Sequence, residues 1–100
     1  MNLHWSPRAT AARKAAILYI QKRSPVAALG QLDQIERQTV MLLDHPEIGR
    51  PGRIKGTLEL VISHTPFIII YRFRPRAKRI DIINFVHGSQ QWPSVKIKIN

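Results

Sequence analysis

The sequence predicts an α+β fold in which a helical hairpin packs on a small, mainly antiparallel sheet, with the element order β-α-α-β-β-β. Over residues 6–45, apolar side chains recur every three or four positions, which is the period of a helix. From residue 58 onwards they fall instead in short runs rich in isoleucine, valine and phenylalanine, which are typical of strands. With 100 residues the chain is about the size of one domain, and we expect residues 1–100 to form one.

Serine–proline pairs mark where the two helices begin. Ser6 and Ser24 can each cap a helix, and the proline that follows each serine fits the first turn, where its missing amide hydrogen costs nothing. The second helix is expected to end before Pro46. Because the connection around Ser24 is so short, the two helices should fold back on each other as an antiparallel hairpin. The residues expected on its buried face are Ile20, Leu29, Leu32, Ile35 and Leu42.

Strands are predicted at residues 58–63, 67–74 and 80–87, where they form an antiparallel meander. Residues 2–5 are short but fit a further strand. Residues 46–56 contain three glycines and two prolines and are expected to form a basic loop. Alternation along each strand assigns one face to the core. The residues expected there are Leu60, Ile62, Phe67, Ile69, Tyr71, Ile82 and Val86.

The formal net charge is +10, from 16 lysines and arginines against six acidic residues. The charge is unevenly placed. Residues 1–49 carry six basic and four acidic side chains, a net of +2, whereas residues 50–100 carry ten basic and two acidic side chains, a net of +8. Such a field favours an anionic partner, which could be a nucleic acid, a ribosome or an acidic protein.

The composition also excludes several classes of function. The chain has no cysteine, which rules out disulfides, thiolate catalysis and cysteine-containing zinc sites. No two histidines stand at the spacing of metal ligands, so we expect neither a metal nor a cofactor. The first residues lack the pattern of a signal peptide, and no apolar run is long enough to span a bilayer. A cytoplasmic protein without membrane contact is therefore expected.

Short segments along nearly the whole chain resemble one family, the RelE/ParE superfamily of toxins from bacterial type II toxin–antitoxin modules, often called plasmid stabilisation proteins. The last two segments are similar to the ParE branch in particular. In order, the segments that carry the resemblance are Trp5-Ser6-Pro7, Asp44-His45-Pro46, Gly49-Arg50-Pro51-Gly52, Leu58-Glu59-Leu60-Val61, Thr65-Pro66-Phe67, Tyr71-Arg72, Val86-His87-Gly88 and Gln91-Trp92-Pro93.

The resemblance implies one of two activities, depending on the branch. RelE-type members are metal-independent endonucleases that cut messenger RNA on the ribosome, whereas ParE-type members poison DNA gyrase without a known catalytic site. Both are neutralised by a cognate antitoxin, which we expect here to be acidic and to form a hetero-oligomer with the toxin. If the chain is a nuclease, its candidate catalytic residues are Arg53, Lys55, Glu59, Arg72 and His87.

Three departures from the RelE pattern favour the ParE branch. RelE-type nucleases commonly have a basic residue where this chain has Thr65-Pro66-Phe67, and many have arginine in place of Leu58. The tyrosine often found near the nuclease site is also missing, since Gly88 and Ser89 follow His87. We therefore favour a protein inhibitor of DNA gyrase over an enzyme. Its expected partner-binding residues are Arg50, Arg53, Arg72, Arg74, His87, Gln91 and Trp92.

Each of these residues also has a plainer interpretation. Arg72 and Arg74 fit ordinary solvated charges of an edge strand, which often carries charges that prevent aggregation. His87 fits a structural strand end, and Trp92 fits an indole that covers the edge of the core.

Overall fold

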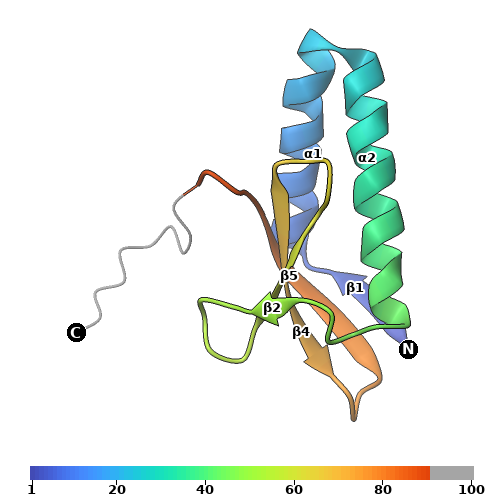
Figure 1. The fold of residues 1–100 in the computed structure, drawn as a ribbon, viewed down its shortest axis with the longest axis vertical. Coiled ribbons are helices and arrows are strands. Elements are labelled where there is room, and N and C mark those ends of the chain that lie inside the picture. Colours follow the sequence, from blue (N-terminus) through green and yellow to red (C-terminus); the bar gives the residue numbers. More distant parts are fainter. Residues whose placement is uncertain (91–100) are drawn as a thin grey trace, which may run out of the picture.

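The computed structural model describes residues 1–90 and has the predicted α+β architecture (Figure 1). The described strands form one five-stranded sheet in the order β1-β5-β4-β3-β2. β1 runs parallel to β5, and all other neighbours are antiparallel. In chain order the elements are β1 (Asn2–Trp5), α1 (Pro7–Arg23), α2 (Pro25–Val40), a 3₁₀ turn (Met41–Leu43), β2 (Arg50–Pro51), β3 (Leu58–Val61), β4 (Phe67–Arg74) and β5 (Arg79–His87).

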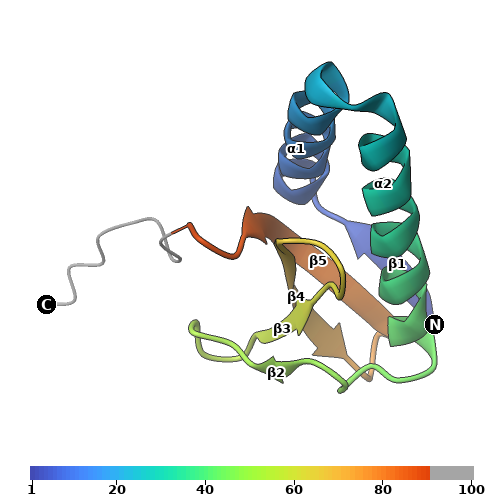
Figure 2. The same cartoon turned by 45° about the horizontal axis from the view of Figure 1, so that its top comes forward.

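Both predicted helix starts are confirmed. The Ser6 hydroxyl accepts the Ala9 amide hydrogen at 3.0 Å, and the Ser24 hydroxyl accepts that of Ala27 at 3.1 Å. Ser24 ends α1 and caps α2 at the same time, so the chain reverses within one residue. Figures 1 and 2 show the resulting hairpin lying against one face of the sheet. Neither helix is long and apolar enough to cross a membrane, as judged over residues 1–90.

The main core lies between the helical hairpin and the sheet. Phe67, Ile69 and Tyr71 of β4 point into it, as their alternation predicts. Ile62 and Ile82 are fully buried in the same cluster, and the predicted Leu60 packs against it half-buried. On the helix side, the fully buried members of this cluster are Ala9, Ile35 and Leu42, with Ile20 half-buried beside them.

The prediction that Leu29 belongs to the core is wrong. Its side chain is 69% exposed, and Leu32 is only half-buried. The buried positions of α2 are instead Ala28, Ile35 and Thr39. The small side chain of Ala28 lets the helices approach each other closely, and Leu29 is rotated about 100° away from it. Near Ser24 the hairpin extends past the sheet, which leaves no strand to cover Leu29 (Figure 1).

Val86 is buried, but on the opposite face of the sheet from the one predicted. It packs with Ile68 and Ile70 in a second, smaller cluster. The cause is a β-bulge in β5, where Ile82 pairs with Tyr71 although Asn84 already pairs with Ile70. The extra residue shifts the alternation by one position. Phe85 therefore faces the helices in place of Val86.

The segment predicted as a loop over residues 46–56 contains the short strand β2. Arg50 pairs with Glu59, and Pro51 with Leu58, at the outer edge of the sheet. Proline is tolerated there because an edge strand leaves one side of its backbone unpaired. The turns on either side of β2 are the irregular part of the segment (Figure 2).

Tyr71 fixes the chain that leads into β2. Its hydroxyl donates to the Pro46 carbonyl at 2.8 Å and accepts the Gly49 amide hydrogen at 3.0 Å. A Cβ on Gly49 would lie 2.8 Å from the Tyr71 hydroxyl and 2.9 Å from the Glu59 carbonyl, so only glycine fits. Burial raises the pKa of the Tyr71 hydroxyl, the bond from Gly49 opposes that rise, and the nearby Glu47 charge adds to it.

Candidate interaction site

Glu59 holds two arginines on the sheet face that points away from the helices. Its side chain is 1% exposed, and it stands opposite Ile70, whose side chain lies on that face. Arg50 donates to one carboxylate oxygen through Nε at 3.2 Å and through Nη2 at 3.0 Å. The Arg53 backbone amide donates to the other oxygen at 3.1 Å, and the Arg53 Nε lies 3.7 Å from it. Both carboxylate oxygens are therefore engaged by cationic residues.

Asp81 forms a second cluster of the same kind. Arg74 Nε donates to one carboxylate oxygen at 2.5 Å, and Arg79 Nε donates to the other at 2.7 Å. Burial alone would raise the pKa of the Asp81 carboxyl. The hydrogen bonds and charges of Arg79 and Arg74 outweigh that effect and hold the pKa below its ordinary value of 3.8.

Arg72 lies on the same sheet face, where it pairs across the strands with Asp81. Its side chain passes over Gly56, because a Cβ added to Gly56 would lie 3.3 Å from Arg72 Nη1. β4 is an inner strand of the sheet, but β3 pairs with it only as far as Tyr71, so Arg72 and Arg74 have β5 alone beside them and the edge-strand interpretation of these two residues stays open. We call this surface the arginine face, and its members are Arg50, Arg53, Arg72, Arg74 and Arg79.

The arginine face has an excess of positive charge and partly fixed side chains. Its five arginines face two carboxylates, Glu59 and Asp81, which leaves a net of +3. The four arginines in ion pairs remain between 43% and 51% exposed. Each carboxylate orients its arginines while leaving half of each side chain open to solvent. Such a surface is suited to bind an anionic partner.

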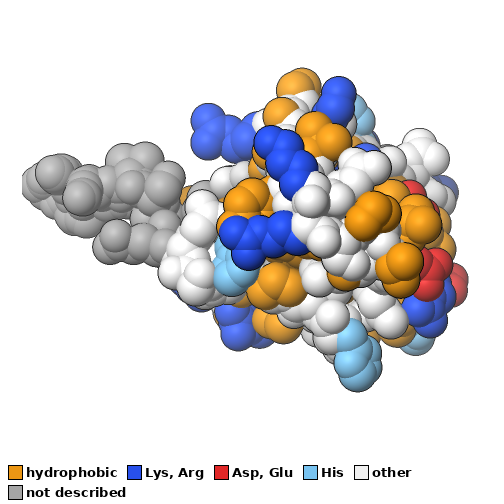
Figure 3. All heavy atoms as spheres, turned by 90° about the horizontal axis from the view of Figure 1, so that it is seen from above, with side chains coloured by type: hydrophobic (Ala, Val, Ile, Leu, Met, Phe, Trp, Pro, Cys, Tyr) orange, Lys and Arg blue, Asp and Glu red, His pale blue; other side chains and the backbone are white. Residues whose placement is uncertain are grey.

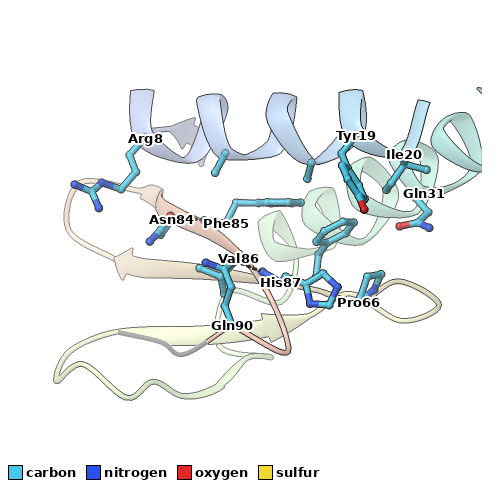
Figure 4. Close-up of a pocket in the computed structure, with 13 residues that line it drawn as sticks. Arg8, Tyr19, Ile20, Gln31, Pro66, Asn84, Phe85, Val86, His87 and Gln90 are labelled. Carbon is cyan, nitrogen blue, oxygen red and sulfur yellow. Dashed lines mark hydrogen bonds between the residues drawn. The ribbon is translucent and has the colours of Figure 1, made fainter. Parts of the chain in front are cut away.

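His87 lies on the other face of the sheet, at the end of β5. Its ring packs edge-on against Phe67, with 5.8 Å between the ring centres. Its Nδ1 accepts the Ser89 amide hydrogen at 3.0 Å and lies 2.7 Å from the Ser89 hydroxyl. His87 also borders an apolar groove of about 470 Å³ between α1 and the end of β5 (Figure 4).

The structure therefore does not bring the nuclease candidates together. Arg53, Glu59 and Arg72 lie on the arginine face, and Lys55 is exposed in the turn between β2 and β3. His87 pairs with Phe67, five residues along β4 from Arg72 and on the opposite face, which places the two backbones roughly 16 Å apart. The other predicted contact residues, Gln91 and Trp92, lie outside the described residues.

The tip of the helical hairpin carries exposed apolar side chains that the sequence did not single out as a surface. Figure 3 looks onto this end of the molecule and shows hydrophobic side chains interspersed with lysine and arginine. Arg23 lies over the Tyr19 ring at 4.9 Å. We call this surface the hairpin patch, and its members are Leu18, Tyr19, Val26 and Leu29, which are 47%, 59%, 81% and 69% exposed.

A helical hairpin packed on one face of this five-stranded sheet, with the other face basic, defines a protein of the RelE/ParE class. The chain matches the family described as "ParE toxin of type II toxin-antitoxin system, parDE" over residues 3–92. It therefore belongs to the ParE toxin family of type II toxin–antitoxin systems, and the predicted family is confirmed.

Two similar proteins agree with this assignment. A protein of Sinorhizobium fredii, described as "Putative toxin Y4kP", is 38% identical over 94 residues, which cover 94% of this chain and 95% of that protein. A chain from a solved structure titled "Chromosomal ParDE TA system from P. aeruginosa" is 26% identical with a TM-score of 0.76. That similarity covers 87% of this chain and 95% of the other.

Proposed function

We propose that this toxin inhibits DNA gyrase by binding it, and that residues 1–100 act as one toxin domain. The observation that carries the proposal is the separation of the candidate acid–base groups. Proton transfer to or from a reacting group needs the donor and acceptor within hydrogen-bond reach. Glu59 is buried against Arg50 and Arg53, and His87 lies on the opposite face of the sheet. Family membership supports the same activity, because gyrase inhibition is the activity of ParE-type toxins.

We assign the contact with the target to the arginine face. Long-range attraction to a large anionic assembly depends on the summed charge of a surface, and oriented side chains lose less entropy on binding. Arg50, Arg53 and Arg74 meet both conditions, because Glu59 and Asp81 orient them while leaving them about half exposed. Arg72 contributes its charge to the same surface. His87 acts in this proposal through packing rather than through chemistry.

We assign the contact with an acidic cognate antitoxin to the hairpin patch. An amphipathic helix or extended segment can lay its apolar residues on Leu18, Tyr19, Val26 and Leu29. Lys22 and Arg23 lie at the same end of α1, where they attract acidic residues of that segment. The similar chain from P. aeruginosa belongs to a ParDE toxin–antitoxin system, which supports a partner of this kind.

The proposed target is tested with purified components. The protein is added to a gyrase supercoiling assay and, separately, to a translation assay with intact ribosomes. We expect supercoiling to stop and translation to continue. Arg72→Glu should weaken the inhibition strongly, whereas the matched charge reversal Lys14→Glu, on an exposed position of α1, should not. Halted translation with cleaved messenger RNA and normal supercoiling would instead establish the nuclease function.

A further inference from the structure

The arginine face runs diagonally across the sheet. Arg50 on β2 stands at the level of Ile70 on β4, because each of them pairs with Glu59. Arg79 on β5 stands opposite Arg74, four residues further along β4. Arg50 and Arg79 are therefore three strand spacings and four residues apart, which is a distance of about 20 Å. The helical hairpin covers the other face of the sheet, so neither α1 nor α2 shields these arginines (Figure 2).

Little negative charge opposes this surface. Glu59 and Asp81 are the only acidic residues on the strands within residues 1–90. The other acidic residues lie on α2 or on the segment that follows it, and they are Asp33, Glu36, Asp44 and Glu47. Exposed cations flank the arginine face instead, with Lys55 in the turn before β3 and Arg76 and Lys78 in the turn between β4 and β5. The positive field therefore extends beyond the five arginines.

Arg72 lies between the ends of the diagonal and forms no ion pair with another residue of the described chain. The hydrogen bonds of Glu59 and Asp81 go to the other arginines of the face. The Arg72 guanidinium lies over Gly56, and β3 pairs with β4 only as far as Tyr71. Its planar fork of donors matches two oxygens of one phosphate group. Arg72 is therefore the arginine best placed to bind an external anion.

The arginine face lacks the apolar centre that protein–protein interfaces have. None of the large apolar side chains that are exposed within residues 1–90 lies between its arginines. The exposed Val61 on β3 is two residues past Glu59, beyond the Arg50 end of the diagonal. Interfaces with nucleic acids are polar and strongly positive. The make-up of this surface therefore favours a nucleic acid over an acidic protein.

The shape of the surface favours the backbone of a duplex. The aromatic side chains of β4, on which unpaired bases would stack, belong to the core on the helix side. The sheet from β2 to β5 is about 14 Å wide, which exceeds the roughly 12 Å of a major groove. It therefore contacts phosphates without entering a groove, and such contacts do not read the base sequence. Over about 20 Å of helix axis, one strand of B-DNA presents about six phosphates.

We propose that the arginine face binds the phosphate backbone of duplex DNA, and that in the cell this duplex is the DNA held by gyrase. The identity of the duplex rests on the proposed function, because gyrase acts on DNA. The toxin then contacts the enzyme and its substrate together, and the arginine face makes the contact with the substrate. Binding is independent of base sequence and weakens steeply as salt rises.

The test measures fluorescence anisotropy of labelled DNA duplexes of two unrelated sequences, titrated with the full chain and without gyrase. Both duplexes should bind equally, and the affinity should fall roughly 10²-fold between about 50 and 200 mM salt, as expected for three to four neutralised phosphates. Arg72→Ala should lower the slope of log affinity against log salt by about one. Lys14→Ala is the matched control, because it removes the same charge from an exposed position of α1 and should leave the slope unchanged.

A second measurement uses the unaltered protein and so does not depend on the folding of a variant. The chain is labelled with ¹⁵N, and its amide signals are followed by NMR during titration with the same duplex. Signals around Arg72, Arg74 and Arg79 should shift, whereas those of α1 should stay in place. Shifts confined to the hairpin would place the DNA elsewhere and exclude the arginine face.

Three further outcomes would overturn the proposal. The first is an equal loss of affinity in Arg72→Ala and Lys14→Ala, which would show that only the net charge matters. The second is tighter binding of single-stranded DNA or of an RNA duplex. The third is binding of a polyglutamate peptide as tightly as DNA and at the same residues, which would assign the surface to an acidic protein.

A gyrase supercoiling assay separates this inference from the proposed function. Absence of DNA binding by a toxin that still inhibits gyrase would overturn the contact with DNA and leave the proposed target in place. DNA binding by a toxin that leaves supercoiling normal would overturn the proposed target and leave the contact with DNA.

Discussion

Arg50 donates two hydrogen bonds, of 3.2 and 3.0 Å, to a single carboxylate oxygen of Glu59, whose side chain is 1% exposed. A carboxylate this well buried cannot be hydrated, so its free energy depends on the arginines that contact it. These hydrogen bonds link β2 to β3 and orient the Arg50 side chain on the arginine face. It connects the stability of the sheet edge to the proposed contact with the target.

Glu59→Gln should lower the free energy of unfolding by about 1–3 kcal/mol, because it removes the charge between two arginines and leaves part of their hydrogen bonding unsatisfied. This loss is smaller than for an ion pair buried on both sides, because Arg50 and Arg53 are about half exposed and solvent screens their charges. Urea denaturation provides the measurement. The control is Asp33→Asn, whose ion pair with Arg37 is exposed on both sides and should contribute little. Equal effects of the two substitutions would contradict a structural role for Glu59.

Asp81 should make stability depend on pH in the acid range. The folded pKa of its carboxyl is lowered, so the unfolded chain binds the proton first as the pH falls. The stabilisation from Arg74 and Arg79 is therefore complete above the ordinary value of 3.8 and is lost as the pH falls through the folded pKa. Asp81→Asn should melt at a lower temperature than the parent protein at neutral pH, and the difference should shrink towards about pH 2. A difference that stays constant over this range would show that the effect is not electrostatic.

Tyr71→Phe should destabilise the protein by about 1–3 kcal/mol, because the Pro46 carbonyl and the Gly49 amide each lose a partner at a part-buried site. Loss of the hydroxyl should also loosen the segment around Gly49 locally, in addition to lowering the stability of the whole protein. Hydrogen exchange at the Gly49 amide should rise more than exchange in α1. Tyr19→Phe removes the same hydroxyl from a side chain that is 59% exposed and serves as the control. Unchanged exchange at Gly49 would mean that Tyr71 does not hold this segment.

The sequence predicted those features that depend on local chemistry. Ser6 and Ser24 fix the helix starts through bonds to amides three residues away, and alternation alone places Ile69 and Tyr71 in the core. It missed what depends on residues distant in the chain. The bulge near Ile83 shifts the faces of β5, and the exposure of Leu29 depends on where the sheet ends.

In the candidate site, too, the sequence predicted what depends on residue type but not what depends on contacts between distant residues. Sequence analysis identified Arg50, Arg53, Arg72 and Arg74 as contact residues but did not assign a partner to each arginine. Glu59 and Asp81 are the two acidic residues in the second half of the chain, and this scarcity was a usable signal. Acidic residues that lie on strands within this strongly basic half of the chain are those expected to pair with arginine inside the fold. The assignment of each arginine to its carboxylate required the strand register.

Leu29→Asp should weaken binding of the antitoxin without unfolding the toxin, because this side chain is 69% exposed in the free protein. Leu42→Ala is the contrasting variant. Its fully buried side chain should contribute about 2–5 kcal/mol to stability. Isothermal titration with the antitoxin and thermal melting of the toxin alone separate the two effects. Full affinity of Leu29→Asp would exclude the hairpin patch as the antitoxin site.

The last prediction concerns His87 and distinguishes binding from proton transfer. If the toxin acts by binding, His87→Ala should retain most of its growth inhibition, because the ring contributes only its packing on Phe67 and its bonds to Ser89. Arg53→Glu and Arg72→Glu should lose more, since each reverses a charge on the arginine face. Growth is measured after matched induction, and thermal melting checks that each variant is folded. In a nuclease, loss of a general acid or base would instead lower cleavage by roughly 10²–10⁴-fold. A His87→Ala protein that folds normally, still binds its target and has lost all toxicity would contradict inhibition by binding alone and would favour a catalytic role for this residue.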